Sequence, residues 1–222
     1  MKKIAVDGPS GAGKSTMVKA LAEKYRLLYV DTGAIYRVVG LFALRAGIGR
    51  EEMGKLIPLL PEIEVSLTHD SEGQRVFLGN EDVTQLIRTP EVSLYASDVS
   101  ALPEVRAKLL ELQRDFARKH DVIMDGRDIG TVVLPDAELK IFLTASAEER
   151  ARRRTQELLD KGMDVTYEET LRQVRERDYN DSHRAVAPLR PADDAVIVDT
   201  TGKGIEETIK LLSGLVEERF GA

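Results

Sequence analysis

Short apolar runs alternate along the chain with longer stretches in which apolar residues recur at helical spacing. The apolar runs predict β-strands at 3–7, 27–30, 122–125, 139–143 and 195–199. The periodic stretches predict helices at 14–24, 34–46, 104–119, 147–161, 167–184 and 205–219. Strands that alternate with helices are typical of a parallel sheet covered by helices, so the pattern predicts an α/β protein.

The segment 62–87 departs from this alternation. Ile63, Val65 and Leu67 alternate with polar residues, and a turn sequence at 79–81 separates two further short apolar segments. Alternation with period two, interrupted by a turn, is typical of antiparallel strands. We therefore expect a small inserted sheet of two or three strands within one domain that spans 1–222.

Composition and charge narrow the class of protein. The chain has 222 residues, 42% of them apolar, and a net charge of −6. This size allows a proper core, and the negative charge disfavours nucleic acid and acidic lipid as partners. The chain has no cysteine, and its three histidines show no metal-binding spacing. No apolar run is long enough for a signal peptide or a membrane span, so we expect a cytoplasmic protein with no membrane partner.

The first predicted strand runs into a glycine-rich segment. The residues fit the phosphate-binding P-loop pattern G-x-x-x-x-G-K-[ST]: Gly8, Pro9, Ser10, Gly11, Ala12, Gly13, Lys14 and Ser15. Backbone N–H groups and the positive end of the following helix would surround the phosphates. Lys14 would reach the β- and γ-phosphates, and the Ser15 hydroxyl would ligate Mg²⁺. The sequence therefore predicts nucleoside triphosphate binding.

A second predicted strand is followed by Asp31 and Thr32, either of which can cap the next helix. Arg37 then lies about one turn into that helix. Two interpretations stay open on this spacing: a capped helix with a surface arginine, or a helix start and an arginine that bind a second phosphate.

The predicted strand at 122–125 ends in charged residues around one glycine. A central strand would deliver Asp125, Arg127 and Asp128 to the sheet edge where ligands bind. Arg127 can bind a phosphate with its planar guanidinium, whereas the two carboxylates can serve a Mg²⁺-bound water, a base edge or Arg127 itself. The alternative is a charged turn that closes a strand. A partly buried segment is expected at 129–134.

The predicted helix 167–184 changes character along one face. An apolar stripe at helical spacing continues into Arg177, Asp181 and Arg184. Buried charges are costly without partners, so either the helix end emerges into solvent or these residues face a polar ligand. Arginines are also frequent from 150 to 190, which fits a small, highly charged ligand or a set of solvated helix faces.

These motifs together resemble the bacterial cytidylate kinase family, the (d)CMP kinases, over essentially the whole chain. The resemblance rests on GPSGAGKST at 8–16, DTGAIYR at 31–37, ASDVSALPEVR at 96–106, DGRDIGT at 125–131 and RDYNDSHRAVAPL at 177–189. It implies a P-loop NTPase fold, a three-layer α/β/α core with a five-stranded parallel sheet. It also implies a monophosphate-binding region at 32–100, which includes the insertion at 62–87, and a short lid at 151–170.

The resemblance also implies roles for individual residues. Residues implied to bind ATP are Gly8, Pro9, Ser10, Gly11, Ala12, Gly13, Lys14, Ser15 and Thr16, with Arg153 and Arg154 from the lid. Residues implied near the acceptor phosphate are Thr32, Arg37, Arg127 and Arg184. Residues implied to read the cytosine are Ser97, Arg106 and Asp128, and those implied to hold the sugar are Arg177 and Asp181. Lys14, Arg127 and Arg184 are expected to act in catalysis.

The reaction so implied is ATP + (d)CMP → ADP + (d)CDP with Mg²⁺, catalysed by a protein that we expect to be a monomer. Phosphoryl transfer requires two anions held in line and their charge neutralised, and the acceptor phosphate is already ionised at neutral pH. Two alternatives stay open. One is a kinase for another small acceptor such as UMP, and the other is a nucleotide-gated switch, although the guanine signature N-K-x-D is absent from the sequence.

Overall fold

The computed structural model describes residues 1–70 and 73–221, and its chain divides into two compact units. The P-loop unit contains Lys2–Leu28 and Asp121–Ala222. The insertion unit contains Tyr29–His120 together with Met1. Each unit has its own core and is described separately.

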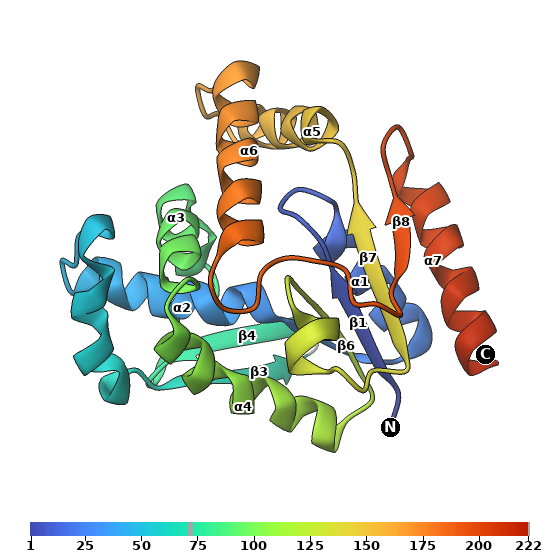
Figure 1. Cartoon of the computed structure of the whole chain (residues 1–222), viewed down its shortest axis with the longest axis horizontal. Helices are drawn as coiled ribbons and strands as arrows, with labels where there is room; N and C mark the ends of the chain where they lie inside the picture. The colour runs from blue at the N-terminus through green and yellow to red at the C-terminus, as the bar shows by residue number, and fades with distance from the viewer. Residues whose placement is uncertain (71–72, 222) are drawn as a thin grey trace. The chain divides into compact units, whose positions relative to one another are not determined.

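The central sheet has five strands in the order β2-β6-β1-β7-β8. Figure 1 labels β6, β1, β7 and β8 of this sheet. Their bounds are β1 Lys3–Asp7, β2 Leu28–Asp31, β6 Val122–Gly126, β7 Leu139–Thr144 and β8 Val196–Asp199. The pairs β1–β6, β1–β7 and β7–β8 are parallel. The predicted α/β fold with a five-stranded parallel sheet is confirmed, and each predicted strand lies within one residue of its observed bounds.

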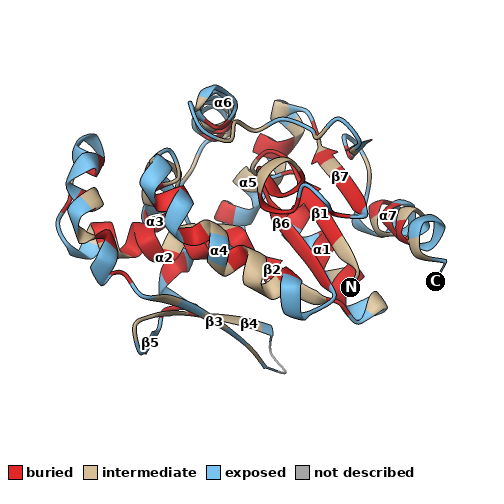
Figure 2. Ribbon diagram, turned by 60° about the horizontal axis from the view of Figure 1, so that its bottom comes forward, coloured by how far each residue is buried: buried red, intermediate tan, exposed pale blue. Residues whose placement is uncertain are grey.

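Four long helices belong to the P-loop unit: α1 Lys14–Tyr25, α5 Ala147–Asp160, α6 Tyr167–His183 and α7 Ile205–Phe220. The side chains of Ser146 and Thr166 accept hydrogen bonds from backbone N–H groups three residues later, which sets where α5 and α6 begin. Figure 2 shows β1, β6 and β7 as mostly buried, as expected for strands that are apolar on both faces.

The segment after β6 forms a single π-helical turn, η3 Ile129–Val133. The sequence predicts a partly buried segment here, and Ile129 and Val133 are indeed buried. The π-turn itself has no sequence signal. Its hydrogen bonds run from the N–H groups of Val133 and Leu134 to the carbonyl oxygens of Asp128 and Ile129, five residues earlier. Such turns are frequent at functional sites.

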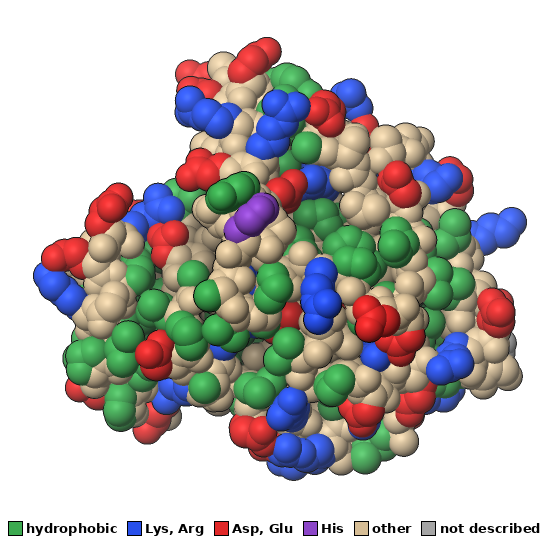
Figure 3. All heavy atoms as spheres, in the orientation of Figure 1, with side chains coloured by type: hydrophobic (Ala, Val, Ile, Leu, Met, Phe, Trp, Pro, Cys, Tyr) green, Lys and Arg blue, Asp and Glu red, His purple; other side chains and the backbone are tan. Residues whose placement is uncertain are grey.

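On the face shown in Figure 3, basic and acidic side chains are interspersed. This agrees with a protein that has 32 Lys and Arg against 38 Asp and Glu. Among the helices that the structure describes, none combines the length and the apolar character needed to cross a membrane.

The described residues of the insertion unit form three α-helices, two 3-10 segments and a small sheet. The helical elements are α2 Thr32–Arg45, η1 Arg50–Glu62, η2 Leu86–Arg88, α3 Pro90–Val99 and α4 Pro103–Lys119. The antiparallel sheet consists of β3 Val65–Asp70, β4 Gly73–Leu78 and β5 Glu81–Asp82. The predicted inserted sheet is therefore confirmed, although Ser71 and Glu72 within it lie outside the described residues.

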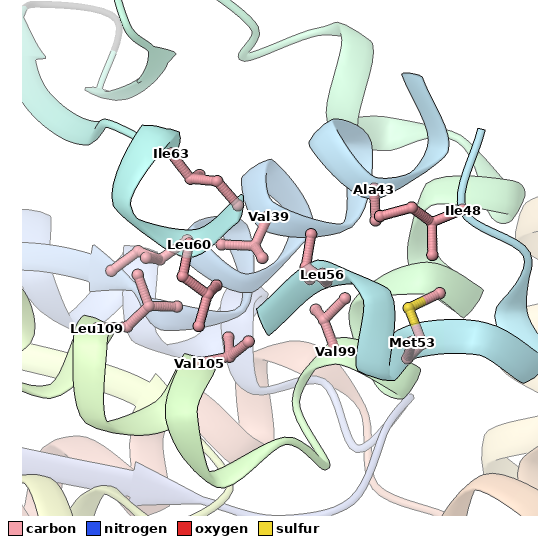
Figure 4. Packing of buried hydrophobic residues seen from close by; sticks show 11 residues of the cluster. Val39, Ala43, Ile48, Met53, Leu56, Leu60, Ile63, Val99, Val105 and Leu109 are labelled. Carbon is pink, nitrogen blue, oxygen red and sulfur yellow. The ribbon is translucent and has the colours of Figure 1, made fainter. Parts of the chain in front are cut away.

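One apolar cluster joins most elements of the insertion unit (Figure 4). Val39 of α2, Leu56 of η1, Val99 of α3 and Val105 of α4 belong to it, and each is fully buried. Burial of these side chains stabilises the unit through the hydrophobic effect, at about 25 cal/mol for each Å² removed from water. This cluster fixes α2, α3 and α4, which carry the predicted acceptor-binding residues of the unit.

Candidate functional site

The P-loop connects β1 to α1 and has the conformation that its glycines permit. Gly8 has φ 149°, and a Cβ there would lie 1.9 Å from the carbonyl oxygen of Leu143. Gly13 has φ 86° and precedes the first residue of α1. Residues with side chains rarely adopt such angles, so glycine is required at both positions. The loop therefore places successive backbone N–H groups at the N-terminus of a helix, where anions bind.

Lys14 lies under this loop with its ammonium group buried. Its Nζ donates hydrogen bonds of 2.8 Å to the carbonyl oxygens of both Gly8 and Pro9. Burial, and then the nearby charge of Arg127, lowers the pKa of Lys14 well below its ordinary value. A phosphate group beside Nζ would favour the charged form again. Lys14 is thus held by weak neutral acceptors at a place where an anion would bind more strongly.

Ser15 and Asp125 bring two oxygen ligands together beside the loop. The Ser15 hydroxyl donates a 2.9 Å hydrogen bond to Oδ2 of Asp125, the last but one residue of β6. Mg²⁺ prefers oxygen ligands and is commonly held by one or two protein groups together with substrate phosphates. The residues present therefore fit Mg²⁺. Within residues 1–70 and 73–221, no three His, Cys, Asp or Glu side chains gather as a metal site.

Arg127 and Asp181 form a partly buried ion pair between the end of β6 and α6, with side chains 20% and 7% exposed. Nε of Arg127 donates a 2.8 Å hydrogen bond to Oδ2 of Asp181. Burial disfavours the charged form of both side chains, but the attraction between the two opposite charges outweighs this effect. Consequently the pKa of Arg127 is raised, chiefly by Asp181, and the pKa of Asp181 is lowered by Arg127, Arg177 and Arg184.

Arg184 joins the same cluster from the end of α6. Its guanidinium nitrogens lie 3.7 Å from Oδ1 of Asp128 and 3.9 Å from Oδ1 of Asp181, and all three side chains are almost fully buried. Its Nε donates a 2.5 Å hydrogen bond to the carbonyl oxygen of Ala187. The solvent-exposed alternative for this end of the predicted helix is therefore wrong. The charged face lies among partners within the P-loop unit.

Sequence reasoning did not give Arg150 a role, yet it contacts the P-loop directly. This buried residue of α5 donates to the carbonyl oxygen of Ser10 at 3.1 Å and forms a double ion pair with Asp178 of α6. A second bond, from Nε, reaches the carbonyl oxygen of Ala145. Only the spacing of Arg150 and Asp178 on predicted neighbouring helices could have suggested the pair, and that signal is weak.

The two predicted lid arginines have different surroundings. Arg153 donates to the carbonyl oxygen of Thr200 at 2.8 Å and to Glu149 at 3.0 Å. Arg154 forms a 2.8 Å bond with Glu157 on its own helix. Of the predicted lid 151–170, the first part is helix α5 and the last part begins α6. ATP binding by these arginines and the function of the segment as a lid stay predictions.

In the insertion unit, Asp31 organises the start of α2. Its Oδ1 accepts a 3.0 Å hydrogen bond from the N–H of Ala34, so Asp31 is the N-cap and Thr32 the first residue of the helix. Its Oδ2 lies 3.7 Å from Arg37 and 3.6 Å from Arg88, which the sequence analysis did not single out. Nη1 of Arg37 is buried and makes no hydrogen bond. Arg37 is therefore more than a surface arginine, and its Nη1 still has a hydrogen to donate.

Ser97 and Arg106, both predicted to read cytosine, lie on α3 and α4 and are linked through Ser100. Arg106 donates to the carbonyl oxygen of Ser100 at 3.2 Å, and the Ser100 hydroxyl donates to the carbonyl oxygen of Ser97 at 2.8 Å. The Arg106 guanidinium also lies 5.4 Å from the ring centre of Tyr36. Arg106 is only 7% exposed, so it is a buried residue of α4.

Comparisons with a family model and with curated relatives identify the same family. Residues 4–218 match the family described as cytidylate kinase. A cytidylate kinase of Carboxydothermus hydrogenoformans is 52% identical over 214 residues, 96% of each chain. One from Caldicellulosiruptor saccharolyticus is 52% identical over 223 residues, covering 100% of this chain and 99% of the relative.

Solved structures share the fold at low sequence identity. A gluconokinase from Sinorhizobium meliloti 1021 superposes with a TM-score of 0.50 at 16% identity, over 98% of this chain and 93% of that one. An uncharacterized protein from Eubacterium ventriosum has a TM-score of 0.55 at 11% identity, with 99% and 100% covered. Identities this low support the similarity of fold alone.

Proposed function

Because the chain belongs to the cytidylate kinase family, we propose that the residues described above transfer the γ-phosphoryl group of ATP to the phosphate of CMP or dCMP. The activity is that of a cytidylate kinase, a phosphotransferase. The observation that best supports these residue roles is the cluster of cationic side chains beside the P-loop. Lys14, Arg127 and Arg184 lie in one unit. The side chains of Lys14 and Arg184 are buried, and that of Arg127 is 20% exposed.

The cluster suits phosphoryl transfer because this reaction needs little covalent help from a protein. It requires that two anions be held in line and that negative charge be stabilised as it shifts to the leaving oxygen. Buried guanidinium groups have a fixed fork of donors and stay charged, so they bind phosphate oxygens in defined directions. Asp181 holds Arg127 and Arg184 in place before the phosphates bind.

For the donor, we assign ATP to the backbone of residues 8–16. Lys14 Nζ moves from the carbonyl oxygens of Gly8 and Pro9 to the β- and γ-phosphates, exchanging neutral acceptors for charged ones. Arg153 and Arg154 approach ATP from the lid. These two assignments rest on the family resemblance, since the observed partners of both arginines are protein groups.

Mg²⁺ would be held by Ser15, with Asp125 accepting the hydrogen bond of a water or of the Ser15 hydroxyl itself. When bound, the ion would supply positive charge that stabilises the negative charge of the phosphate groups. Ser15 orients one oxygen toward it, and Asp125 fixes that hydroxyl at 2.9 Å.

For the acceptor, Thr32, Arg37, Arg127 and Arg184 bind the phosphate of CMP or lie around it. Ser97 and Arg106 donate hydrogen bonds to the ring nitrogen and carbonyl of cytosine, and the Asp128 carboxylate accepts one from its amino group. Arg177 and Asp181 hold the sugar. No protein group needs to remove a proton, because the attacking phosphate oxygen is already ionised.

The direct test is ADP release with CMP, dCMP, UMP, AMP and GMP as acceptors. We expect CMP and dCMP to be used best, and a preference for another monophosphate or for none would contradict the proposal.

Asp128→Ala should lower kcat/KM for CMP by at least about tenfold, the discrimination given by one hydrogen bond to a charged group. ATP hydrolysis without acceptor should be unchanged, and the exposed Asp193→Ala serves as control. An equal loss of both reactions would remove Asp128 from base recognition.

We further propose that the enzyme acts as a monomer in the cytoplasm, where its ATP is available. Its substrates are small molecules, and neither nucleic acid nor a membrane is needed for the reaction.

A further inference from the structure

A buried carboxylate lies at the end of β1, directly before the P-loop, and has no part in the site described above. Asp7 is 4% exposed. Its Oδ1 accepts a 2.7 Å hydrogen bond from the N–H of Ile129, and its Oδ2 accepts one of 2.7 Å from the N–H of Gly130. One side chain therefore holds the first two N–H groups of the η3 turn, more than 120 residues away in sequence.

The position of Asp7 is costly. Burial raises its pKa to about 6, against the opposing effect of the two backbone hydrogen bonds. Without the carboxylate, the buried N–H groups of Ile129 and Gly130 would lose their acceptors, which is costly. The two backbone hydrogen bonds offset part of the cost of burying this carboxyl group.

The two N–H groups come directly after Arg127 and Asp128 in the chain, the residues that we assign to acceptor binding. In the sheet register Asp7 lies opposite Gly126, the last residue of β6. Arg127 and Asp128 follow Gly126, and Ile129 comes next. The dipeptide is therefore fixed at both ends, by the β1–β6 ladder before it and by the Asp7 carboxylate after it.

Gly130 makes this close approach possible. A Cβ at Gly130 would lie 3.4 Å from Oδ2 of Asp7 and 3.1 Å from Cδ of Lys140. The η3 turn also closes on Asp128, whose carbonyl oxygen accepts from the N–H groups of Val132 and Val133 at 2.9 and 3.1 Å. The carboxylate and the turn together leave the backbone of Asp128 with one orientation.

We propose that Asp7 is a positioning residue for phosphoryl transfer: by holding the N–H groups of Ile129 and Gly130, it sets the directions in which Arg127 and Asp128 project. The inference rests on the proposed function, because it assigns Asp7 to the residues that bind the acceptor.

The test is Asp7→Asn, which keeps the shape of the side chain and one acceptor but turns an NH₂ group toward the second backbone N–H. We expect KM for CMP to rise about tenfold and kcat to fall about tenfold, because small displacements of binding groups are costly in phosphoryl transfer. KM for ATP should stay within about twofold of wild type, since the P-loop backbone does not depend on the η3 turn.

The matched control is Asp121→Asn. Asp121 accepts a 2.7 Å bond from the N–H of Lys2, at the opposite end of the same two strands. This variant should keep both KM values and kcat. If Asp7→Asn leaves CMP kinetics within about twofold of wild type, or raises KM for ATP in step with KM for CMP, the positioning role is overturned.

A measurement on the wild-type protein keeps the inference testable if Asp7→Asn fails to fold. Amide hydrogen exchange by NMR should show Ile129 and Gly130 as strongly protected as the residues of β1 and β6. Exchange at the rate of an open loop would overturn the inference even in a fully active enzyme. Conversely, a wild-type protein in which the Ile129 and Gly130 amides are protected but which does not phosphorylate CMP would contradict the proposed function. The Asp7 hydrogen bonds would then still be supported.

Discussion

At the scale of single residues, partners far apart in sequence decide what the charged side chains do. The P-loop could be predicted because its residues are contiguous and its glycines are required by its own backbone. The partners of Asp7 and Arg150 could not, since Ile129 and Ser10 lie more than 100 residues from them. A strand end with a single aspartate, or one arginine among many on a helix, has no local pattern that points to such contacts.

Asp7 should make stability depend on pH. Burial raises its pKa from the ordinary 3.8 to about 6, and Asp128 adds to the shift while Lys14 opposes it. The charge of Arg127 also interacts with the Asp7 carboxyl. Since the pKa is higher in the folded chain, the contribution of Asp7 is fully favourable below about pH 4 and is lost as pH rises through about 6. The change amounts to about 3 kcal/mol.

Urea unfolding of wild type and Asp7→Asn, measured from pH 4 to pH 7.5, checks this. The free energy of unfolding of wild type should fall relative to that of the variant by about 2 kcal/mol over this range, because the unfolded carboxyl is already partly ionised at pH 4. Two curves that stay parallel across it would mean that the folded protein does not perturb the Asp7 carboxyl. Other groups titrate in both proteins and cancel in the difference.

At the scale of elements, long periodic helices and buried strands could be read from the sequence, and short ones could not. The inserted strands at 62–87 could be predicted from two local signals, the alternation of apolar and polar residues and the turn sequence at 79–81. Helix α3 Pro90–Val99 was missed, although Thr89 caps it and Pro90 occupies its first turn. Its length of ten residues gives too few turns for an apolar stripe to stand out. The π-turn after β6 depends on Asp7 and likewise has no local signal.

The inserted sheet should influence acceptor binding through Gln74 of β4. Its Oε1 accepts a 2.8 Å bond from the N–H of Asp31, and its Nε2 donates a 3.2 Å bond to the carbonyl oxygen of the same residue. Asp31 caps α2 and faces Arg37. Gln74→Ala should therefore raise KM for CMP about fivefold, the effect of about 1 kcal/mol from the lost hydrogen bonds.

Arg75→Ala is the matched control for Gln74→Ala, because neighbouring residues of a strand point to opposite faces. Arg75 pairs with Asp70 and Asp82 inside the small sheet. Steady-state kinetics should show CMP binding unaffected in Arg75→Ala and KM for ATP unaffected in both variants. A Gln74→Ala enzyme with an unchanged KM for CMP would confine the insertion to a structural role.

At the scale of the whole molecule, the chemistry divides between the two units. The P-loop unit contains the residues assigned to ATP and to the transferred phosphoryl group, and the insertion unit contains Thr32, Arg37, Ser97 and Arg106. The fold class and the family could be predicted because the motifs come in order along the whole chain. The lid at 151–170 and the region 32–100 stay predictions, since they concern motion and ligands.

The central claim is that ATP loses a phosphoryl group to CMP at the P-loop. The most direct measurement is ³¹P NMR of the protein with ATP, CMP and Mg²⁺, beside the variants Lys14→Ala and Lys19→Ala, the latter exposed on the same helix. We expect one CDP for each ADP with wild type and Lys19→Ala. Lys14→Ala should retain the fold and be at least about a hundredfold slower, as for loss of one charged group at the reacting phosphates. Inorganic phosphate in place of CDP, or normal CDP formation by Lys14→Ala, would contradict the claim.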